Sequence, residues 1–344
     1  MKKNIEHIGY MITILTTAIL SLISLAVFPA LDALAQPPPA TSADTVAVGR
    51  KVRCLGTIYS VDEQGKPNLK DGLPKGIALD EAGKLFAVFL DRTEVQVFNA
   101  QGKFLYRFGK KGTGPGAFVL PMSIEVAGNG TVLVLDPELK KVLAFSNKGE
   151  FQSEFSFAES KGPHDKEPVR CTKMGLDRRN DVLYLSDSAN ANIKLFNLKG
   201  DFLGLFPLDR AKAVAAPGKT SFDSQGRIYI IDSINGWVQV YSSQKKLLLS
   251  FGELGARLGN LARPVAVSVN SQGNIYVLDR LLSVIQIFDP SGRVIDLIKD
   301  TDVPDGLNSA EPFDMVMDAQ GTIYVSLQGP HCIKVLKDSG ERRR

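Results

Sequence analysis

Hydrophobic and polar positions alternate along this chain with a period of two, in short runs bounded by turn residues. Residues 226–232 and 273–279 are two such runs, and residues 237–241 and 284–288 are two more. Short alternating runs rich in Val, Ile and aromatic residues predict β-strands. No stretch beyond residue 50 has the 3.6-residue period of an amphipathic helix. The pattern therefore predicts an all-β protein.

The predicted strands belong to a unit of about 47 residues that recurs six times. In five units, a turn glycine follows a proline by nine residues and precedes a bulky residue by fifteen. These glycines are Gly83, Gly130, Gly226, Gly273 and Gly321. The third unit differs, because Asp181 replaces the glycine and one extra residue precedes it. Each unit has four predicted strands, which is typical of a β-propeller blade.

The sixth unit ends near Gly340 and has no room for a fourth strand. Residues 51–56 resemble a fourth strand without its first three, as a comparison with residues 104–109 indicates. We therefore expect this N-terminal strand to complete the sixth blade, since an open ring would leave unpaired strand edges. The predicted fold is an all-β, six-bladed β-propeller of four-stranded blades that spans residues 50–340.

This closure has a consequence for the three cysteines, Cys54, Cys171 and Cys332. Matching the strands of the sixth blade by their landmarks places Cys54 opposite Cys332, within a residue of register. A disulfide between them is a candidate staple for the ring, because it would limit the unfolded chain. The alternative is three buried thiols.

The first 35 residues have the organisation of a secretory signal peptide. Lys2 and Lys3 give a positive start, residues 8–28 are apolar, and Ala33 and Ala35 form a small-x-small cleavage site. An uncleaved membrane anchor is the alternative, since the apolar stretch is about long enough to span a bilayer. We expect the chain to be exported to the periplasm or the extracellular space, or else anchored by this segment.

The remaining segments are a proline-rich spacer at residues 36–49, predicted to be unstructured, and a basic tail at residues 341–344. The chain has 41 Lys and Arg against 37 Asp and Glu, a formal net charge of +4. This charge is too small to indicate a nucleic-acid partner. We expect a monomer.

The connector sequences resemble those of a known repeat family. The glycine-rich segment of residues 108–118, followed by Pro121, resembles the inter-blade connector of NHL repeats, and residues 251–260 resemble a second copy. The runs that end at an aspartate resemble the strand-then-Asp element of that family. Blades one and six depart from it, with Phe89 and Leu327 in place of the Asp. The resemblance implies a six-bladed propeller. It implies no single activity, since NHL domains include lyases, receptor ectodomains, RNA binders and protein-binding platforms.

The strand-ending residues of four blades are Asp136, Asp187, Asp232 and Asp279. We interpret them as structural, because a carboxylate at a tight loop accepts local backbone N–H bonds. Beyond the leader the chain has two histidines, His164 and His331, far apart in the sequence. Zinc needs clustered His or Cys ligands and hard cations need several oxygens, so we expect no metal and no cofactor.

Aligning the innermost strands by their prolines identifies the side chains that are expected to line the central channel. The polar members of this set are Glu125, Lys173, Lys219 and Asp314. The alternating positions, among them Ile77, are apolar and are expected to pack between blades. A channel-centred lyase or hydrolase, possibly metal-dependent, would have to use these four polar groups.

The loops between blades, and between the second and third strands of each blade, gather on one face of a propeller. Basic residues outnumber acidic ones in these segments, and a basic face attracts anionic partners. The candidates for a ligand-binding face are Arg92, Lys110, Lys140, Lys141, Arg170, Arg263 and Arg280. The predicted function is an exported binding module for a protein, peptide or polysaccharide. A scaffold in an envelope complex is the remaining alternative.

Overall fold

The computed structural model of the protein describes residues 50–69, 71–209, 213–299 and 311–342. The chain divides into two units, Met1–Thr45 and Val46–Arg344. The predicted signal segment and the predicted spacer lie outside the described residues. Within the described ranges, no helix is long and apolar enough to cross a membrane.

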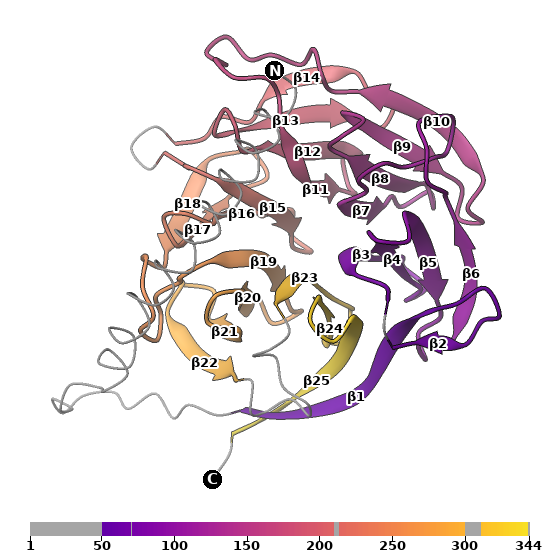
Figure 1. The fold of residues 1–344 in the computed structure, drawn as a ribbon. Coiled ribbons are helices and arrows are strands. Elements are labelled where there is room, and N and C mark those ends of the chain that lie inside the picture. Colours follow the sequence, from indigo (N-terminus) through magenta and orange to yellow (C-terminus); the bar gives the residue numbers. More distant parts are fainter. Residues whose placement is uncertain (1–49, 70, 210–212, 300–310, 343–344) are drawn as a thin grey trace, which may run out of the picture. The chain divides into compact units, whose positions relative to one another are not determined.

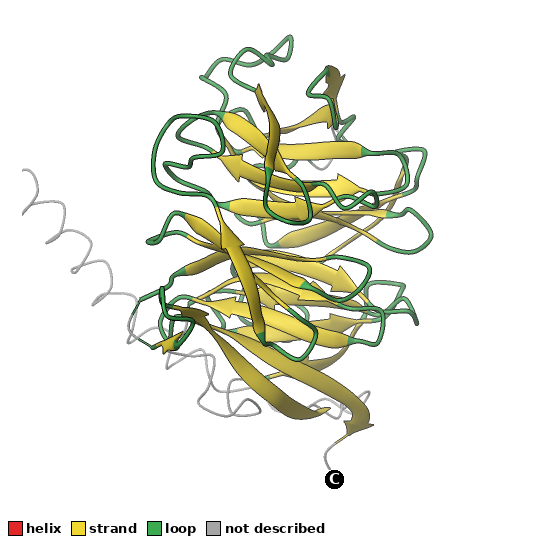
Figure 2. Cartoon of the chain, turned by 90° about the vertical axis from the view of Figure 1, so that its right-hand side faces the viewer, coloured by secondary structure: helices red, strands yellow, loops and turns green. Residues whose placement is uncertain are grey.

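The described part of the second unit forms six antiparallel sheets around a central axis (Figure 1, Figure 2), which confirms the six-bladed β-propeller. Strands that follow each other in the chain are neighbours in each sheet, and β3, β7, β11, β15, β19 and β23 form the inner ring. The strands are β1 (Arg50–Val61), β2 (Pro67–Asn68), β3 (Pro74–Leu79), β4 (Leu85–Phe89), β5 (Glu94–Phe98), β6 (Phe104–Phe108), β7 (Ser123–Val126), β8 (Val132–Asp136), β9 (Lys141–Phe145), β10 (Phe151–Ser156), β11 (Cys171–Asp177), β12 (Val182–Asp187), β13 (Asn192–Asn197), β14 (Phe202–Leu205), β15 (Pro217–Phe222), β16 (Ile228–Asp232), β17 (Trp237–Tyr241), β18 (Leu247–Phe251), β19 (Pro264–Val269), β20 (Ile275–Asp279), β21 (Val284–Phe288), β22 (Val294–Ile298), β23 (Pro312–Met317), β24 (Thr322–Leu327) and β25 (Cys332–Arg342).

The N-terminal strand closes blade six, as the sequence predicts. β1 pairs with β25 along its length, from Arg50 opposite Arg342 to Tyr59 opposite Cys332. The short β2 pairs with the end of β1 and gives this blade a fifth strand. β25 continues to Arg342, so the strand includes the first two residues of the segment expected to be a tail.

The candidate disulfide between Cys54 and Cys332 does not form in this structure, because the two residues are not opposite each other. Cys54 lies opposite Leu336, whereas Cys332 lies opposite Tyr59, several residues further along the pair of strands. The thiol of Cys54 instead donates a hydrogen bond to the carbonyl of Gly56, and the two cysteines are not joined.

Burial explains the true register of β1. The sequence comparison equates Leu55 with Phe108, the buried last residue of β6. In the structure, Ile58 takes that place: it pairs with Ile333 as Phe108 pairs with Val95. Ile58 is 6% exposed and Leu55 is 45% exposed. The strand therefore shifts by three residues from the expected register and buries its apolar side chain.

The apolar alternate positions of the inner strands pack between blades, as expected. Ile77, Ile124, Met174 and Met315 are each at most 1% exposed and belong to separate apolar clusters. The inner strands also approach each other closely. A Cβ atom on Gly175 would lie 2.1 Å from the carbonyl oxygen of Thr220 in the next blade, so this position requires glycine.

The strand-ending aspartates have the structural role that the sequence predicts. The carboxylate of Asp136 accepts hydrogen bonds from two backbone amides of the preceding connector and from two of the loop that follows it. The same carboxylate-to-backbone arrangement recurs at Asp187, Asp232 and Asp279. Each aspartate therefore ties a connector to the loop between the second and third strands of its blade.

Blade three adds an ion pair to this arrangement. The fully buried ammonium of Lys194, on β13, lies 3.3 Å from Asp187 and 2.5 Å from Asp165. Asp165 belongs to the long insertion between β10 and β11. Because both side chains of the second pair are buried, this insertion is held against blade three rather than extending freely from the surface.

Candidate functional site

The strand directions give the propeller two different faces. We call the face that carries the inter-blade connectors and the loops between second and third strands the loop face. We call the opposite face, which carries the short turns between the other strands, the turn face. All seven candidate cations of the predicted ligand-binding face belong to loop-face segments or to the strand end beside one.

Three of these seven cations already have acidic partners. Arg92 lies 3.0 Å from Glu94, and Arg280 lies 2.7 Å from Glu311. Lys141 is paired with Glu154 on the neighbouring strand. The other four have exposed side chains and make no ion pair with a described residue; they are Lys110, Lys140, Arg170 and Arg263.

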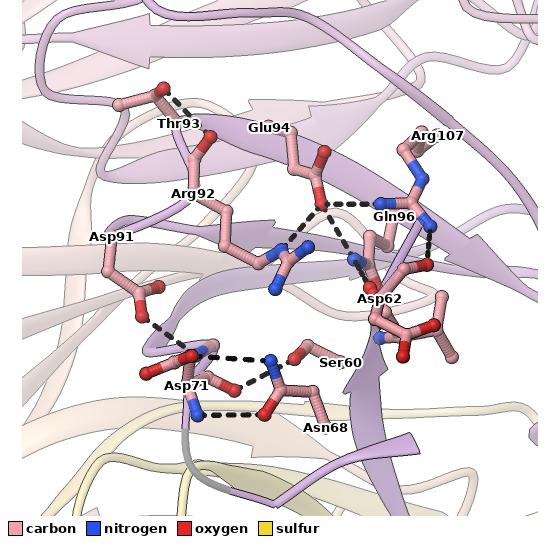
Figure 3. A network of polar contacts seen from close by, with 12 residues as sticks. Ser60, Asp62, Asn68, Asp71, Asp91, Arg92, Thr93, Glu94, Gln96 and Arg107 are labelled. Carbon is pink, nitrogen blue, oxygen red and sulfur yellow. Dashed lines mark hydrogen bonds and ion pairs between the residues drawn. The ribbon is translucent and has the colours of Figure 1, made fainter. Parts of the chain in front are cut away.

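Arg92 belongs to a structural network at the junction of blades one and six (Figure 3). The carboxylate of Glu94 accepts hydrogen bonds from Arg92, from Arg107 and from the side-chain amide of Gln96. The same amide of Gln96 bonds the backbone N–H and carbonyl of Val61 at the end of β1. The network therefore fastens the closing strand to blade one, and Arg92 is occupied there.

The predicted channel groups do converge on the axis. The ammonium of Lys219, from blade four, lies 3.0 Å from the Asp314 carboxylate of blade six. It also lies 3.5 Å from Glu125 of blade two and 3.4 Å from the carbonyl oxygen of Ile77 in blade one. One lysine thus links four blades across the centre of the ring. We call Glu125, Lys219 and Asp314 the axial cluster.

Lys173 crosses the axis nearer the loop face and meets a different environment. Its ammonium lies 3.6 Å from the centre of the Phe313 ring and 3.3 Å from the Phe313 carbonyl oxygen. The ammonium of Lys75 lies 4.4 Å from the same ring centre and donates to the side-chain oxygen of Gln328. The side-chain nitrogen of Gln328 is buried and has no hydrogen-bond partner in the described structure. Three donor groups, the two ammonium groups and the Gln328 amide, therefore meet beside one aromatic ring, and we call this place the loop-face mouth.

The charges explain how these lysines titrate. Burial, together with the nearby cations Lys219, Lys75 and Arg280, lowers the pKa of Lys173 to about 8, although Asp314 partly opposes this. Burial and Arg280 also lower the pKa of Lys75. Burial alone would lower the pKa of Lys219, but Asp314 and Glu125 outweigh it and raise that pKa. The charge of Lys219 is thus compensated by the acids beside it, whereas the charges of Lys75 and Lys173 at the loop-face mouth are not.

Sequence reasoning missed Lys75 and Phe313, and the backbone gives the reason. Both directly follow the proline that begins their strand, a position expected to alternate away from the channel. A β-bulge lies between this proline and the regular part of β3 and of β23. A bulge adds a residue to one strand and re-aims the side chains beside it. The simple alternation used for the alignment therefore fails at this end of the inner strands.

A cavity of about 310 Å³ opens on the other side of the axial cluster, toward the turn face. Glu125 and Lys219 line its inner end, and Arg178 and Arg179 lie at its rim. Arg178 donates a 2.6 Å hydrogen bond to the carbonyl of Leu79, two blades away. The turn-face arginines were not predicted, although they occupy the extra-long turn of the third unit, where the repeat pattern breaks.

The residues that the structure describes contain no group of three His, Cys, Asp or Glu side chains that could hold a metal ion. Neither His164 nor His331 lines the turn-face cavity. Where an oxygen-rich cation site could form, between Asp314, Glu125 and the Ile77 carbonyl, the ammonium of Lys219 provides the positive charge. The oxygen atoms at the axis therefore surround the ammonium of Lys219, in the place that a metal cation would otherwise take.

Comparisons with known proteins agree with the fold. A family model described as a 6-bladed beta-propeller matches residues 81–174. Protein brain tumor of Drosophila melanogaster is 23% identical over 175 residues, a region that covers 51% of this chain and 16% of that protein. The chain thus matches about a sixth of the length of that relative. The narrower assignment to the NHL-repeat family stays a prediction.

Solved structures show the same architecture at low sequence identity. A catalytically inactive virginiamycin B lyase from Staphylococcus aureus, solved with quinupristin, has a TM-score of 0.56 at 13% identity and covers 86% of this chain and 97% of its own. A protein of unknown function from Bacteroides thetaiotaomicron has a TM-score of 0.61 at 15% identity, covering 83% of this chain and 75% of its own. At such identities the likeness establishes the fold alone: this chain is a six-bladed β-propeller.

Proposed function

We propose that this chain is an exported binding module that holds an anionic group of its ligand at the loop-face mouth. The observation that carries the proposal is the pair of ammonium groups, Lys75 and Lys173, that share the Phe313 ring without a carboxylate at ion-pair distance among the described residues. An aromatic face stabilises a cation, but it does not cancel the repulsion between two cations. An anion bound between the two ammonium groups would cancel this repulsion.

Neighbouring groups favour the same ligand charge. Arg280 lies close enough to lower the pKa of both lysines, and it is itself paired with Glu311, whose side chain is largely exposed. The buried side-chain nitrogen of Gln328 adds a donor that has no acceptor among the described residues. A carboxylate can accept several hydrogen bonds at once, so it matches this set of donors.

The wider loop face favours an acidic peptide segment of a protein over a small molecule. The exposed cations Lys110, Lys140, Arg170 and Arg263 are distributed around the ring rather than gathered at the axis. An extended acidic partner can contact several of them and place one carboxylate at the loop-face mouth. The predicted signal segment supports a partner outside the cytoplasm, and a monomer is sufficient for this mode of binding.

A channel-centred lyase or hydrolase has less support. The likeness to virginiamycin B lyase is one of fold, and the axial cluster fixes Glu125 and Asp314 to a single lysine. A scaffold role in an envelope complex rests on the platform shape alone. We therefore take ligand binding as the function that the geometry supports best.

The proposal can be tested with a fluorescein-labelled peptide of eight alternating Asp and Gly residues, followed by fluorescence anisotropy at low salt. Replacing Lys75→Gln together with Lys173→Gln should weaken binding on the order of tenfold, because the loop-face mouth loses its two ammonium groups. Charge reversal at Lys140→Glu with Lys141→Glu, farther from the axis, should weaken it less.

The matched control is Lys103→Gln with Lys148→Gln, which removes the same charge from exposed turns of the turn face. Equal losses in both double variants would show general charge attraction and would contradict the proposed site, as would the absence of binding to the unchanged protein. Tighter capture of heparin than of the peptide, with the same dependence on Lys75 and Lys173, would reassign the partner to a sulfated polysaccharide.

A further inference from the structure

The turn-face cavity is lined by the last residues of the inner strands, on the opposite side of the axial cluster from the loop-face mouth. Its volume of about 310 Å³ is near the lower end of the range for small-molecule pockets. Its walls include Phe222, Val267, Met315 and Met317. A cavity of this size, with flexible thioethers in its wall, suits a small ligand with an apolar side chain.

The inner end of the cavity has unused acceptor capacity. Glu125 interacts with Lys219 at 3.5 Å, while that ammonium lies closer to Asp314, at 3.0 Å. Two carboxylates share one ammonium here, so the axial cluster carries one net negative charge when both acids are ionised. Burial raises the pKa of Glu125, because its carboxylate is desolvated without enough donors. A second ammonium, supplied by a ligand, would neutralise the remaining negative charge at the inner end of the cavity.

The rim has the opposite charge. Arg178 is fixed across the opening by its hydrogen bond to Leu79, and Arg179 makes no ion pair or side-chain hydrogen bond with a described residue. The two acids nearby are already engaged. Asp177 accepts hydrogen bonds within its own turn, and Asp223 is paired with Arg227. Arg178 also attracts the Glu125 carboxylate through space, but neither guanidinium makes an ion pair with a described carboxylate. The rim therefore suits a ligand carboxylate, which arginine binds well.

We propose that the turn-face cavity binds a zwitterionic amino acid or short peptide. The ligand's ammonium lies against Glu125, its carboxylate contacts Arg178 and Arg179 at the rim, and its apolar side chain packs on the walls beside Met315 and Met317. This site lies on the other face from the loop-face mouth, so it is a second binding activity that does not depend on the acidic-peptide site.

The test is isothermal titration calorimetry with four probes: leucine, leucyl-leucine, N-acetyl-leucine and leucinamide. N-acetyl-leucine lacks the ammonium and leucinamide lacks the carboxylate, so each should bind at least about tenfold more weakly than leucine or leucyl-leucine. Glu125→Gln should remove the preference for leucine over N-acetyl-leucine. Arg179→Gln should reduce the preference for leucine over leucinamide, because the second guanidinium is lost.

Arg179 is exposed, so its variant keeps the test valid even where Glu125→Gln impairs folding. Lys199→Gln, an equal charge change on an exposed turn away from the cavity, should leave all four affinities unchanged. The proposal is overturned if no probe binds at millimolar concentration, or if leucine and its two blocked analogues bind alike. Lys75→Gln with Lys173→Gln should not alter leucine binding, which separates this test from that of the loop-face mouth.

Discussion

Lys173 and Lys219 occupy the same position in neighbouring blades, two residues after the start of the inner strand, yet they meet opposite surroundings. Lys219 finds two carboxylates and a carbonyl, and its pKa is raised. Lys173 finds an aromatic ring, a carbonyl and other cations, and its pKa falls to about 8. Both lysines lie at the axis because they occupy equivalent positions of the repeated unit. The residues contributed by the facing blades decide what each of them does there.

The difference distinguishes a lysine whose charge stabilises the fold from a lysine whose charge can still bind a ligand. Lys219 has its counter-charges inside the protein and holds four blades together across the axis. Lys173 is desolvated without a carboxylate in ion-pair contact, so it gains more from an external anion. Within one ring of equivalent positions, the group whose charge is not balanced by the fold is the better candidate for ligand binding.

The largest expected effect comes from removing a carboxylate that compensates the charge of Lys219. Asp314→Ala removes the nearest partner of Lys219 and leaves an ammonium buried beside Glu125 alone. We expect a loss of about 3–5 kcal/mol in the free energy of unfolding, measured by urea denaturation. The double variant with Lys219→Met should lose less than the sum of the two single variants, because the two residues interact. Additive losses would show that the pair is not coupled.

Measuring the free energy of unfolding as a function of pH tests the uncompensated charge of Lys173. Between pH 8 and 10.5 the unfolded chain keeps a proton on Lys173 that the folded protein has released, so the stability of the folded state rises with pH over this window. Relative to Lys173→Met, the unchanged protein should gain about 2 kcal/mol between pH 7.5 and 10. Lys219 is present in both proteins, so the effect of its raised pKa cancels from this difference. A constant difference between the two proteins would contradict the lowered pKa.

The smallest effect should come from a surface pair, which gives the baseline for both lysines. Lys141 and Glu154 are paired on adjacent strands, with side chains about one third exposed. Lys141→Ala should change the free energy of unfolding by no more than about 0.5 kcal/mol, because exposed ion pairs contribute little. Thermal and urea denaturation would check this. A loss comparable with that of Asp314→Ala would remove the distinction between axial and surface charges.

The sequence predicts the architecture well because the blade repeats. Glycine, proline and aspartate at fixed intervals identify six units, and the missing strand of the last unit identifies the closure by the N-terminal strand. The register of that strand was misjudged, since Gly56 resembles the turn glycine Gly109 but lies within a continuous strand. The register of β1 depends on burying Ile58 and leaving Leu55 exposed, and the spacing of glycines and prolines does not reveal which of the two is buried.

The site was less accessible from the sequence for two physical reasons. Alternation identified Glu125, Lys173, Lys219 and Asp314, but the bulge at the start of the inner strands hid Lys75. No site residue was predicted on the turn face, although the third unit departs from the repeat at a turn of that face. Which lysine would find a carboxylate depends on contacts between blades far apart in sequence, and one chain's sequence does not specify these.

The closing pair of strands has a mechanical consequence. Arg50 lies opposite Arg342, so the two ends of the propeller leave it side by side at one edge of blade six. A force applied between these ends would open the β1–β25 pair one hydrogen bond after another, as a zipper opens, instead of loading all of them together. We expect the ring to open first at this blade, while blades two to five keep their sheets. Joining the two ends with a short linker would remove this weak point and allow new ends to be cut at a turn in another blade.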